Sequence, residues 1–536
     1  MPARTRRTAV VVAALGLVLA ALVTSPPAVD AHPSGGGGHG PGRSSLDVRT
    51  DTGVVRGFRD QGVDTFRGIP YAAPPVGALR WQPPQPHARW RGVLETTSYG
   101  PRCAALESTN GPRTEAEDCL YLNVDRPTGA RPGERLPVYV FIHGGGLVNG
   151  SSNQASGEKI AREAHVIVVS MNYRLGVFGF LGLSGLSGQG SGDYGFLDQQ
   201  AALRWVRSNV AAFGGDPGNV TVGGESAGGF SVCGHLTSPG SRGLFNRAMI
   251  QSGSCLSRPV AETETDSTSF AAAAGCSDPA TAVTCLRGKD TATLLDASSG
   301  FSPTLTSGTA ALPEPPTDAV AAGRFTRVPV VNGSNRDEGR TFAQGYIGAD
   351  EAAYDDFVRS SYPDDADAVL AHYPWPATAD RFTAAYLVGA IMTDSGMLAG
   401  IGGCGALSLT EQLARWVPVH AYEFDARNGP GLTPIEGYVW GAGHAAELAY
   451  LFPSFDNGTP IAPTFDAGER QLSRDMVQYW GSFVARGTPY APGRAFWPVW
   501  NGSGQVMSLR VAGQSHTIST AAYRAEHQCD FWDSVG

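Results

Sequence analysis

The chain has 536 residues, of which 42% are hydrophobic and 17% charged, and its formal net charge is -9. This composition is typical of a globular protein that buries a large core, and it excludes a fibrous or a disordered chain. The negative charge argues against nucleic acid and against an anionic membrane surface as partners, because both bind basic protein faces.

The first 31 residues have the features of a signal peptide. Three arginines within the first seven residues precede an apolar run over residues 9–23, and residues 28–31 offer a cleavage site. The apolar run is short for a membrane-spanning helix, so we expect it to be removed and to leave no stable membrane anchor. A glycine-rich linker is expected over residues 32–45, followed by a single secreted domain over residues 46–536.

The chain contains eight cysteines, which can pair if the protein is exported to an oxidising compartment. Cys103 lies near enough to Cys119 in sequence to close a short loop. Cys276 is also close to Cys285. The sequence alone leaves open the pairing of the other four, which are Cys233, Cys255, Cys404 and Cys529.

Strand-like and helix-like segments alternate through the first half of the chain, which predicts a parallel sheet covered by helices. Short apolar runs indicate the strands, and apolar residues at helical spacing indicate a helix. In chain order we expect strands over residues 137–142 and 166–171, a helix over residues 195–209, and strands over residues 219–222, 327–331 and 419–424. We find no internal repeat, which excludes solenoids and propellers.

Residues 224–228 fit the pattern Gly-x-Ser-x-Gly. In this pattern a sharp turn between a strand and a helix presents the serine, and side chains at the glycine positions would collide with both elements. A chain with 70 glycines can contain the pattern by chance. Here an expected strand ends just before it and a helical pattern begins just after it, so we interpret Ser226 as a nucleophile.

A serine hydroxyl needs a neutral imidazole to accept its proton and an acid to orient that imidazole. In this type of fold the acid follows the serine in sequence and the histidine comes last. Asp337 and Glu338 follow the expected strand over residues 327–331, and the choice between them stays open. We prefer His444 as the base because it lies in a glycine-rich loop. The other downstream histidines are His372, His420, His516 and His527.

Attack on a carbonyl group develops negative charge on its oxygen, and backbone N–H groups must already face that oxygen. The segment His-Gly-Gly-Gly at residues 143–146 supplies such donors, together with the N–H of Ala227. The sequence contains neither His-Glu-x-x-His nor the closely spaced Cys and His of a zinc site. We therefore expect a reaction without a metal or another cofactor.

Three segments resemble the type-B carboxylesterase family, the group of cholinesterases and bacterial para-nitrobenzyl esterases. They read FRGIPYAAPPVG (residues 66–77), EDCLYLNV (117–124) and FGGDPGNVTVGGESAG (213–228), and the resemblance extends over residues 46–532. It implies an α/β-hydrolase fold with a central, mostly parallel sheet, helices on both faces and a small N-terminal antiparallel sheet. It also implies a serine carboxylesterase that hydrolyses small-molecule esters through an acyl-enzyme intermediate.

The resemblance also assigns roles residue by residue. It implies Ser226 as the nucleophile, Glu338 as the acid and His444 as the base. The implied oxyanion hole consists of Gly145, Gly146 and Ala227, and the implied supporting residues are Glu225 and Ser252. The implied disulfides are Cys103–Cys119, Cys276–Cys285 and Cys404–Cys529, with Cys233 and Cys255 free or paired with each other.

The chain departs from the family pattern at two places. Leu147 follows the glycine triplet where the family usually has phenylalanine. A helix expected after Asp394 carries Ser-Gly-Met-Leu over residues 395–398, where the family commonly has bulkier or basic residues. We expect both changes to alter the substrate pocket and to leave the chemistry unchanged. The alternative functions are a lipase for longer-chain esters and a non-catalytic binding module on the same fold. The second is disfavoured because the whole implied triad is present.

Overall fold

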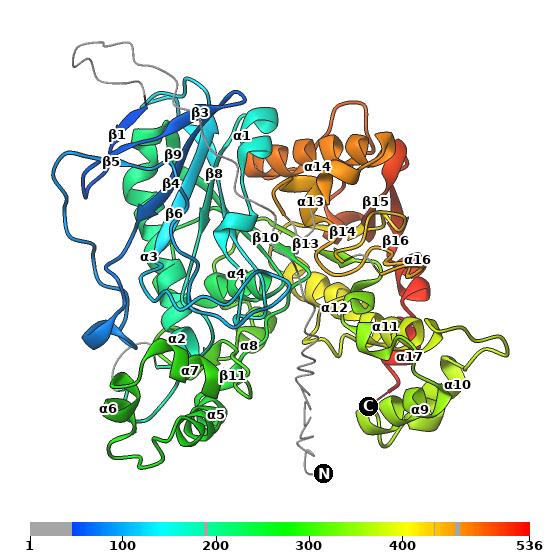
Figure 1. Cartoon of the computed structure of the whole chain (residues 1–536). Helices are drawn as coiled ribbons and strands as arrows, with labels where there is room; N and C mark the ends of the chain where they lie inside the picture. The colour runs from blue at the N-terminus through cyan, green and yellow to red at the C-terminus, as the bar shows by residue number, and fades with distance from the viewer. Residues whose placement is uncertain (1–45, 187–190, 434, 456–460, 536) are drawn as a thin grey trace.

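The computed structural model describes residues 46–186, 191–433, 435–455 and 461–535, so the expected signal peptide and linker over residues 1–31 and 32–45 lie outside the described residues. Within the described segments, eleven strands form one sheet through the molecule (Figure 1). In order across the sheet they are β16 (His516–Ser519), β15 (Gln505–Leu509), β14 (Val419–Phe424), β13 (Val330–Asn335), β10 (Arg247–Gln251), β9 (Gly215–Glu225), β7 (Leu136–Ile142), β8 (Ile167–Met171), β6 (Tyr121–Pro127), β4 (Val63–Pro70) and β3 (Phe58–Asp60). All neighbours from β15 to β8 are parallel, and the strands beyond them at both edges are antiparallel.

Both faces of the sheet are buried, as parallel strands require. Along β7, Val138 and Val140 enter one core while Tyr139 and Phe141 enter the other, because successive residues of a strand point to opposite faces. The first core lies against α3 (Tyr194–Asn209), α4 (Ala227–Thr237) and α12 (Gly403–Ala414). The second lies against α1 (Glu158–Ala164), α11 (Thr383–Ser395) and α14 (Ala467–Arg486), and Figure 1 shows α3 and α14 on opposite sides of the sheet.

A small second sheet lies near the N-terminus of the described chain. Strands β1 (Asp47–Arg49) and β2 (Val54–Arg56) pair antiparallel, as expected. Strand β5 (Val93–Glu95) joins β2 in parallel orientation, so this sheet is mixed. None of the helices in the described segments is long and apolar enough to cross a membrane.

The elements expected from the sequence form with three differences. Strands β7, β8 and β14 and helix α3 begin and end within one residue of the prediction. Strand β9 is longer, and β13 is displaced toward Asn335 because β10 and β14 pair with it on both sides. The prediction of a helix over residues 395–398 is wrong, since α11 ends at Ser395 and Gly396 takes a left-handed conformation with φ 70°.

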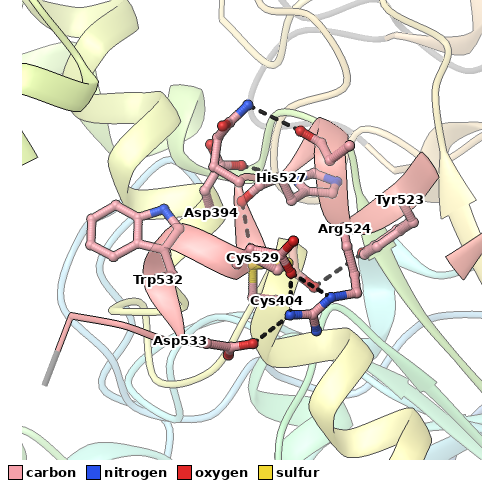
Figure 2. The surroundings of a disulfide bond; sticks show 12 residues. Asp394, Cys404, Tyr523, Arg524, His527, Cys529, Trp532 and Asp533 are labelled. Carbon is pink, nitrogen blue, oxygen red and sulfur yellow. Dashed lines mark hydrogen bonds and ion pairs between the residues drawn. A yellow bond between two sulfur atoms is a disulfide. The ribbon is translucent and has the colours of Figure 1, made fainter. Parts of the chain in front are cut away.

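Four disulfides pair all eight cysteines. They include the three implied by the resemblance, and Cys233 bonds to Cys255, the pair that the sequence leaves open. The bridge between Cys404 and Cys529 joins the start of α12 to α17 (Cys529–Trp532) near the end of the chain (Figure 2). The pairs are Cys103–Cys119, Cys233–Cys255, Cys276–Cys285 and Cys404–Cys529.

Candidate active site

The candidate residues follow five neighbouring parallel strands. In sheet order, the glycine triplet follows β7, Ser226 follows β9, Ser252 follows β10, Glu338 follows β13 and His444 lies in the chain that leaves β14. The carboxyl ends of parallel strands meet at one edge of a sheet. This topology therefore brings residues from distant parts of the sequence together.

Ser226 forms a strained bend between β9 and α4. Its φ is 56° and its ψ is -123°, a combination that residues other than glycine rarely adopt. The neighbouring glycines leave no space for side chains. A methyl group at Gly228 would lie 2.0 Å from the carbonyl oxygen of Ile142, and one at Gly224 would lie 2.5 Å from the backbone of Gly228. The close approach of β7, β9 and α4 thus explains the glycine spacing around the serine.

His444 is held by Glu338, with 2.6 Å between Nδ1 and Oε2. The other carboxylate oxygen of Glu338 accepts hydrogen bonds from the Ser252 hydroxyl at 2.5 Å and from the N–H of Asn335 at 2.7 Å. Glu338 has no exposed surface. Because a carboxylate accepts hydrogen bonds, this pairing places a proton on Nδ1 and leaves Nε2 available as a base.

Glu225, the last residue of β9, faces the other nitrogen of His444. Its Oε1 lies 3.2 Å from Nε2, and its side chain is buried. Burial raises the pKa of Glu225 to about 8. Burial alone disfavours a charged imidazole, but Glu225 and Glu338 outweigh it and raise the pKa of His444 to about 9. The imidazole therefore becomes neutral, and able to accept a proton, only as the pH rises.

A third buried carboxylate, Glu447, was not predicted from the sequence. Its oxygens accept hydrogen bonds from the side-chain amides of Asn335 at 2.7 Å and Gln251 at 3.2 Å. Burial raises the pKa of Glu447. It lies three residues after His444 in the same segment, and this spacing of an acid after the candidate base was the available signal.

The glycine triplet packs directly against the bend at Ser226. A methyl group at Gly144 would lie 3.0 Å from Cβ of Ser226. Gly145 has φ 99° and Gly146 has φ 62°, and such left-handed turns can direct consecutive N–H groups toward an anion. Ala227 begins α4, so its N–H has no acceptor within the helix. Within the described segments these N–H groups have no hydrogen-bond acceptor, so the arrangement places available donors beside the serine.

Other sequence candidates lie apart from this group. Asp337 accepts a hydrogen bond from the N–H of Ala442 at 3.0 Å and lies 3.4 Å from Arg340 and from Arg427. Within the described residues, the side-chain hydrogen bonds of the four remaining histidines go to partners other than the candidate triad; these histidines are His372, His420, His516 and His527.

Glu225, the residue before Ser226, links the bend to the imidazole, because its Oε1 lies 3.2 Å from Nε2 of His444. No hydrogen bond of the described residues joins the Ser226 hydroxyl to His444, whose Nε2 faces Glu225. In enzymes without substrate such bonds are often long and tighten on binding. The described part of the chain contains no group of three His, Cys, Asp or Glu residues that could hold a metal ion.

The parallel sheet and the strand–turn–helix at Ser226 define an α/β-hydrolase. The sequence model of the Carboxylesterase family matches residues 44–532. The chain therefore belongs to the carboxylesterase family, and the protein is a carboxylic-ester hydrolase.

Several known proteins are similar along most of their length. Acylcarnitine hydrolase of Mus musculus is 34% identical over 499 residues, covering 86% of this chain and 87% of that protein. Para-nitrobenzyl esterase of Bacillus subtilis (strain 168) is 35% identical over 462 residues, covering 82% and 90%. Cocaine esterase of Homo sapiens is 33% identical over 545 residues and covers 92% of each chain. A solved structure of PNB esterase matches with a TM-score of 0.75 at 30% identity, covering 90% of this chain and 100% of that one.

Proposed function

We propose that the protein is a secreted serine esterase in which Ser226, His444 and Glu338 cleave carboxylic esters through an acyl-enzyme intermediate. The observation that carries this proposal is the buried imidazole of His444, which lies 2.6 Å from Glu338 at the sheet edge where Ser226 follows β9. An oriented imidazole activates a hydroxyl that is otherwise a poor nucleophile at neutral pH. The esterase names of the relatives support a small-molecule ester as the substrate.

In the first half of the reaction, the oxygen of Ser226 bonds to the carbonyl carbon and its proton passes to Nε2 of His444. The carbonyl oxygen becomes an oxyanion bound by the N–H groups of Gly145, Gly146 and Ala227. His444 then gives its proton to the alcohol as the carbon–oxygen bond breaks, and the acyl group stays on the serine. In the second half, water attacks the acyl carbon and gives a proton to His444. The carboxylic acid leaves as that proton returns to the serine oxygen.

The test is hydrolysis of para-nitrophenyl esters of increasing acyl length by the native protein and by Ser226→Ala. We expect the variant to lose all measurable turnover while it keeps the native circular dichroism spectrum. Ser503→Ala removes a hydroxyl from an exposed serine and serves as the matched control. Mass spectrometry after acid quench should find one acyl group on the peptide that contains Ser226. Normal turnover by Ser226→Ala would overturn the proposed mechanism.

The same ester series separates an esterase from a lipase. A soluble esterase reaches its highest turnover with dissolved esters and shows no increase when the ester forms droplets. A rise in rate above the solubility limit of a long-chain ester would instead identify a lipase.

The proposal of secretion rests on residues 1–31 and on the four disulfides, which are typical of oxidising compartments. Expression of the full chain in a secreting host tests it. We expect active protein in the culture medium with an N-terminus at His32. Retention of residues 1–31 on a cell-associated product would contradict the proposal.

A further inference from the structure

His143 is a buried histidine beside the glycine triplet, and the reaction described above does not use it. Its side chain is only slightly exposed, and Nδ1 lies 2.8 Å from the carbonyl oxygen of Gly144. A carbonyl oxygen can only accept a hydrogen bond, so Nδ1 carries the proton and donates. Within the described part of the chain, the buried Nε2 has no hydrogen-bond partner.

The ring of His143 is neutral. Burial lowers its pKa to about 4, and Arg102 adds to this effect although the bond to Gly144 opposes it. A neutral imidazole with its proton on Nδ1 has a single N–H to donate, and that N–H is directed at the backbone of Gly144.

The peptide bond after Gly144 links this hydrogen bond to the candidate oxyanion hole. The carbonyl oxygen of Gly144 and the N–H of Gly145 belong to one planar trans peptide, so they point in opposite directions. A ring that holds the oxygen on one side therefore turns the N–H of Gly145 to the other side. The same stretch is packed against the bend, since a methyl group at Gly144 would lie 3.0 Å from Cβ of Ser226.

The ring itself is held in place by a second aromatic residue. Tyr173 stacks on His143 with 4.4 Å between the ring centroids and 19° between the ring planes. The hydroxyl of Tyr173 also donates a hydrogen bond to the carbonyl oxygen of His143 at 2.9 Å. Gly150 closes the other approach, because a methyl group there would lie 2.7 Å from Nδ1 of His143. The donor thus has little freedom to turn away from Gly144.

We propose that His143 is a positioning residue of this hydrolase, whose Nδ1–H fixes the peptide between Gly144 and Gly145 so that the Gly145 N–H already faces the developing oxyanion. The proposal rests on the proposed function, because it assumes that Gly145 binds the oxygen of an ester attacked by Ser226. It predicts an effect on the transition state and almost none on the binding of the planar ester.

Two variants separate this role from a merely structural one. His143→Phe keeps a ring that can stack on Tyr173 and removes the donor. His143→Asn places an amide N–H near the position of Nδ1 and should restore part of the activity. We expect His143→Phe to lower kcat by roughly 10- to 100-fold, because one N–H donor of the oxyanion hole is then no longer correctly oriented. KM should change little.

A pair of inhibitors provides the decisive measurement. A trifluoromethyl ketone forms a tetrahedral oxyanion on the serine, so its affinity should fall in His143→Phe by the same factor as kcat. The corresponding carboxamide stays planar and should bind both proteins equally. Equal kcat and equal ketone affinity in the native protein and His143→Phe would overturn the proposal. Equal losses in kcat for the Phe and Asn variants would also contradict it.

Labelling with a fluorophosphonate keeps this outcome distinct from failure of the proposed function. If the native protein is not labelled on Ser226, the proposed function itself is wrong. If the native protein and both variants are labelled on Ser226 but their kinetics are identical, only the role of His143 is wrong. If His143→Phe does not fold, Tyr173→Phe takes its place in the comparison, because it keeps the stacked ring and loses the hydrogen bond that holds His143.

Discussion

Two adjacent carboxylates near His444 have different partners. Glu338 lies 2.6 Å from the imidazole, whereas Asp337 bonds to the backbone of Ala442 and lies close to Arg340. We expect Glu338→Gln to lower kcat roughly 10²- to 10⁴-fold, because an amide cannot stabilise the imidazolium and favours the wrong tautomer. Asp337→Asn removes the negative charge of the adjacent carboxylate, which does not contact the imidazole, and should leave kcat nearly unchanged.

Steady-state kinetics on both variants with one para-nitrophenyl ester measures the difference. Asp337→Asn should instead lower the unfolding midpoint, because the cationic neighbours of Asp337 hold its pKa below the ordinary value although burial opposes them. Larger loss of kcat in Asp337→Asn than in Glu338→Gln would reverse the assignment of the acid.

We expect Glu225 to set the pH at which His444 can act as a base. Its carboxylate lies 3.2 Å from Nε2 and contributes to the raised pKa of His444. Replacement by a neutral amide removes one negative neighbour, so the pKa of His444 falls and its neutral form persists to lower pH. We expect Glu225→Gln to shift the acidic limb of the pH profile of kcat/KM downward by roughly 1 to 2 units.

The profile is measured from about pH 5 to about pH 10 on a substrate that does not ionise. Glu262→Gln, in which an exposed glutamate is replaced, should leave the limb where the native protein has it. An acidic limb at the same pH in Glu225→Gln and in the native protein would mean that Glu225 is already neutral when His444 titrates.

At the scale of the elements, local pattern and tertiary contacts determine different parts of the structure. Strands β7 and β14 are short apolar runs, so their predicted ends match the structure closely. Strand β13 differs because Asn332 is polar and yet buried in the strand. Its amide donates a hydrogen bond at 2.8 Å to Thr410, which lies 78 residues away on α12. The residues around Asn332 in sequence therefore do not predict that this side chain is buried.

In the candidate site, too, the local sequence predicts some features and tertiary contacts determine the others. The glycine spacing around Ser226 is local and predicts the bend, since its steric cause lies within β9, α4 and the adjoining strand β7. The contacts of Glu225 and Glu447 with their surroundings depend on strands β10 and β13 meeting the segment of His444. Residue spacing therefore indicates only Glu447, three residues after His444, whereas the positions of Glu225 and Glu338 beside the imidazole come from the tertiary structure. The resemblance to a family supplied the choice of Glu338.

The last helices of the chain are anchored through a buried charge. His527 has no exposed surface, and its nitrogens lie 2.8 Å from Asp394 of α11 and 2.7 Å from Glu423 of β14. Burial disfavours the charged ring, but the two carboxylates outweigh it and raise the pKa of His527 to about 9. Because the folded pKa lies above the ordinary value, the stabilisation is complete below about pH 6.5 and is lost as the pH rises through about 9.

We therefore expect His527→Gln to lower the free energy of unfolding by on the order of 3 kcal/mol at about pH 6, because two buried carboxylates lose their cation. The difference from the native protein should shrink at about pH 10, where the native imidazole is neutral. Urea unfolding at both pH values measures it, and the exposed His516→Gln is the control. The same difference at both pH values would show that the native His527 is uncharged.

Across the molecule, the start of α12 packs between the candidate acid and the C-terminal segment. A methyl group at Gly402 would lie 3.4 Å from Cγ of Glu338, and one at Gly403 would lie 3.0 Å from the ring of His527. The bridge between Cys404 and Cys529 ties this same turn of α12 to α17 (Figure 2). The backbone at the start of α12 therefore contacts both Glu338 and the ring of His527.

This arrangement predicts that the long disulfide matters more than a short one. The bridge between Cys404 and Cys529 spans 125 residues, whereas that between Cys276 and Cys285 spans 9. In the chain-entropy description, the longer loop stabilises the folded state by about 2 kcal/mol more. We expect the double serine variant at positions 404 and 529 to lose correspondingly more free energy of unfolding than the matched variant at positions 276 and 285.

Ester hydrolysis followed across the same urea series tests the link to the site. The bridge between Cys404 and Cys529 holds the backbone that packs against Glu338. In its absence, activity should be lost at a lower urea concentration than that at which tryptophan fluorescence reports global unfolding. In the variant at positions 276 and 285 the two transitions should coincide, since that bridge packs in a separate apolar cluster with Phe270 and Leu286. Coincident transitions in both variants would mean that the C-terminal segment stabilises the fold without supporting the acid.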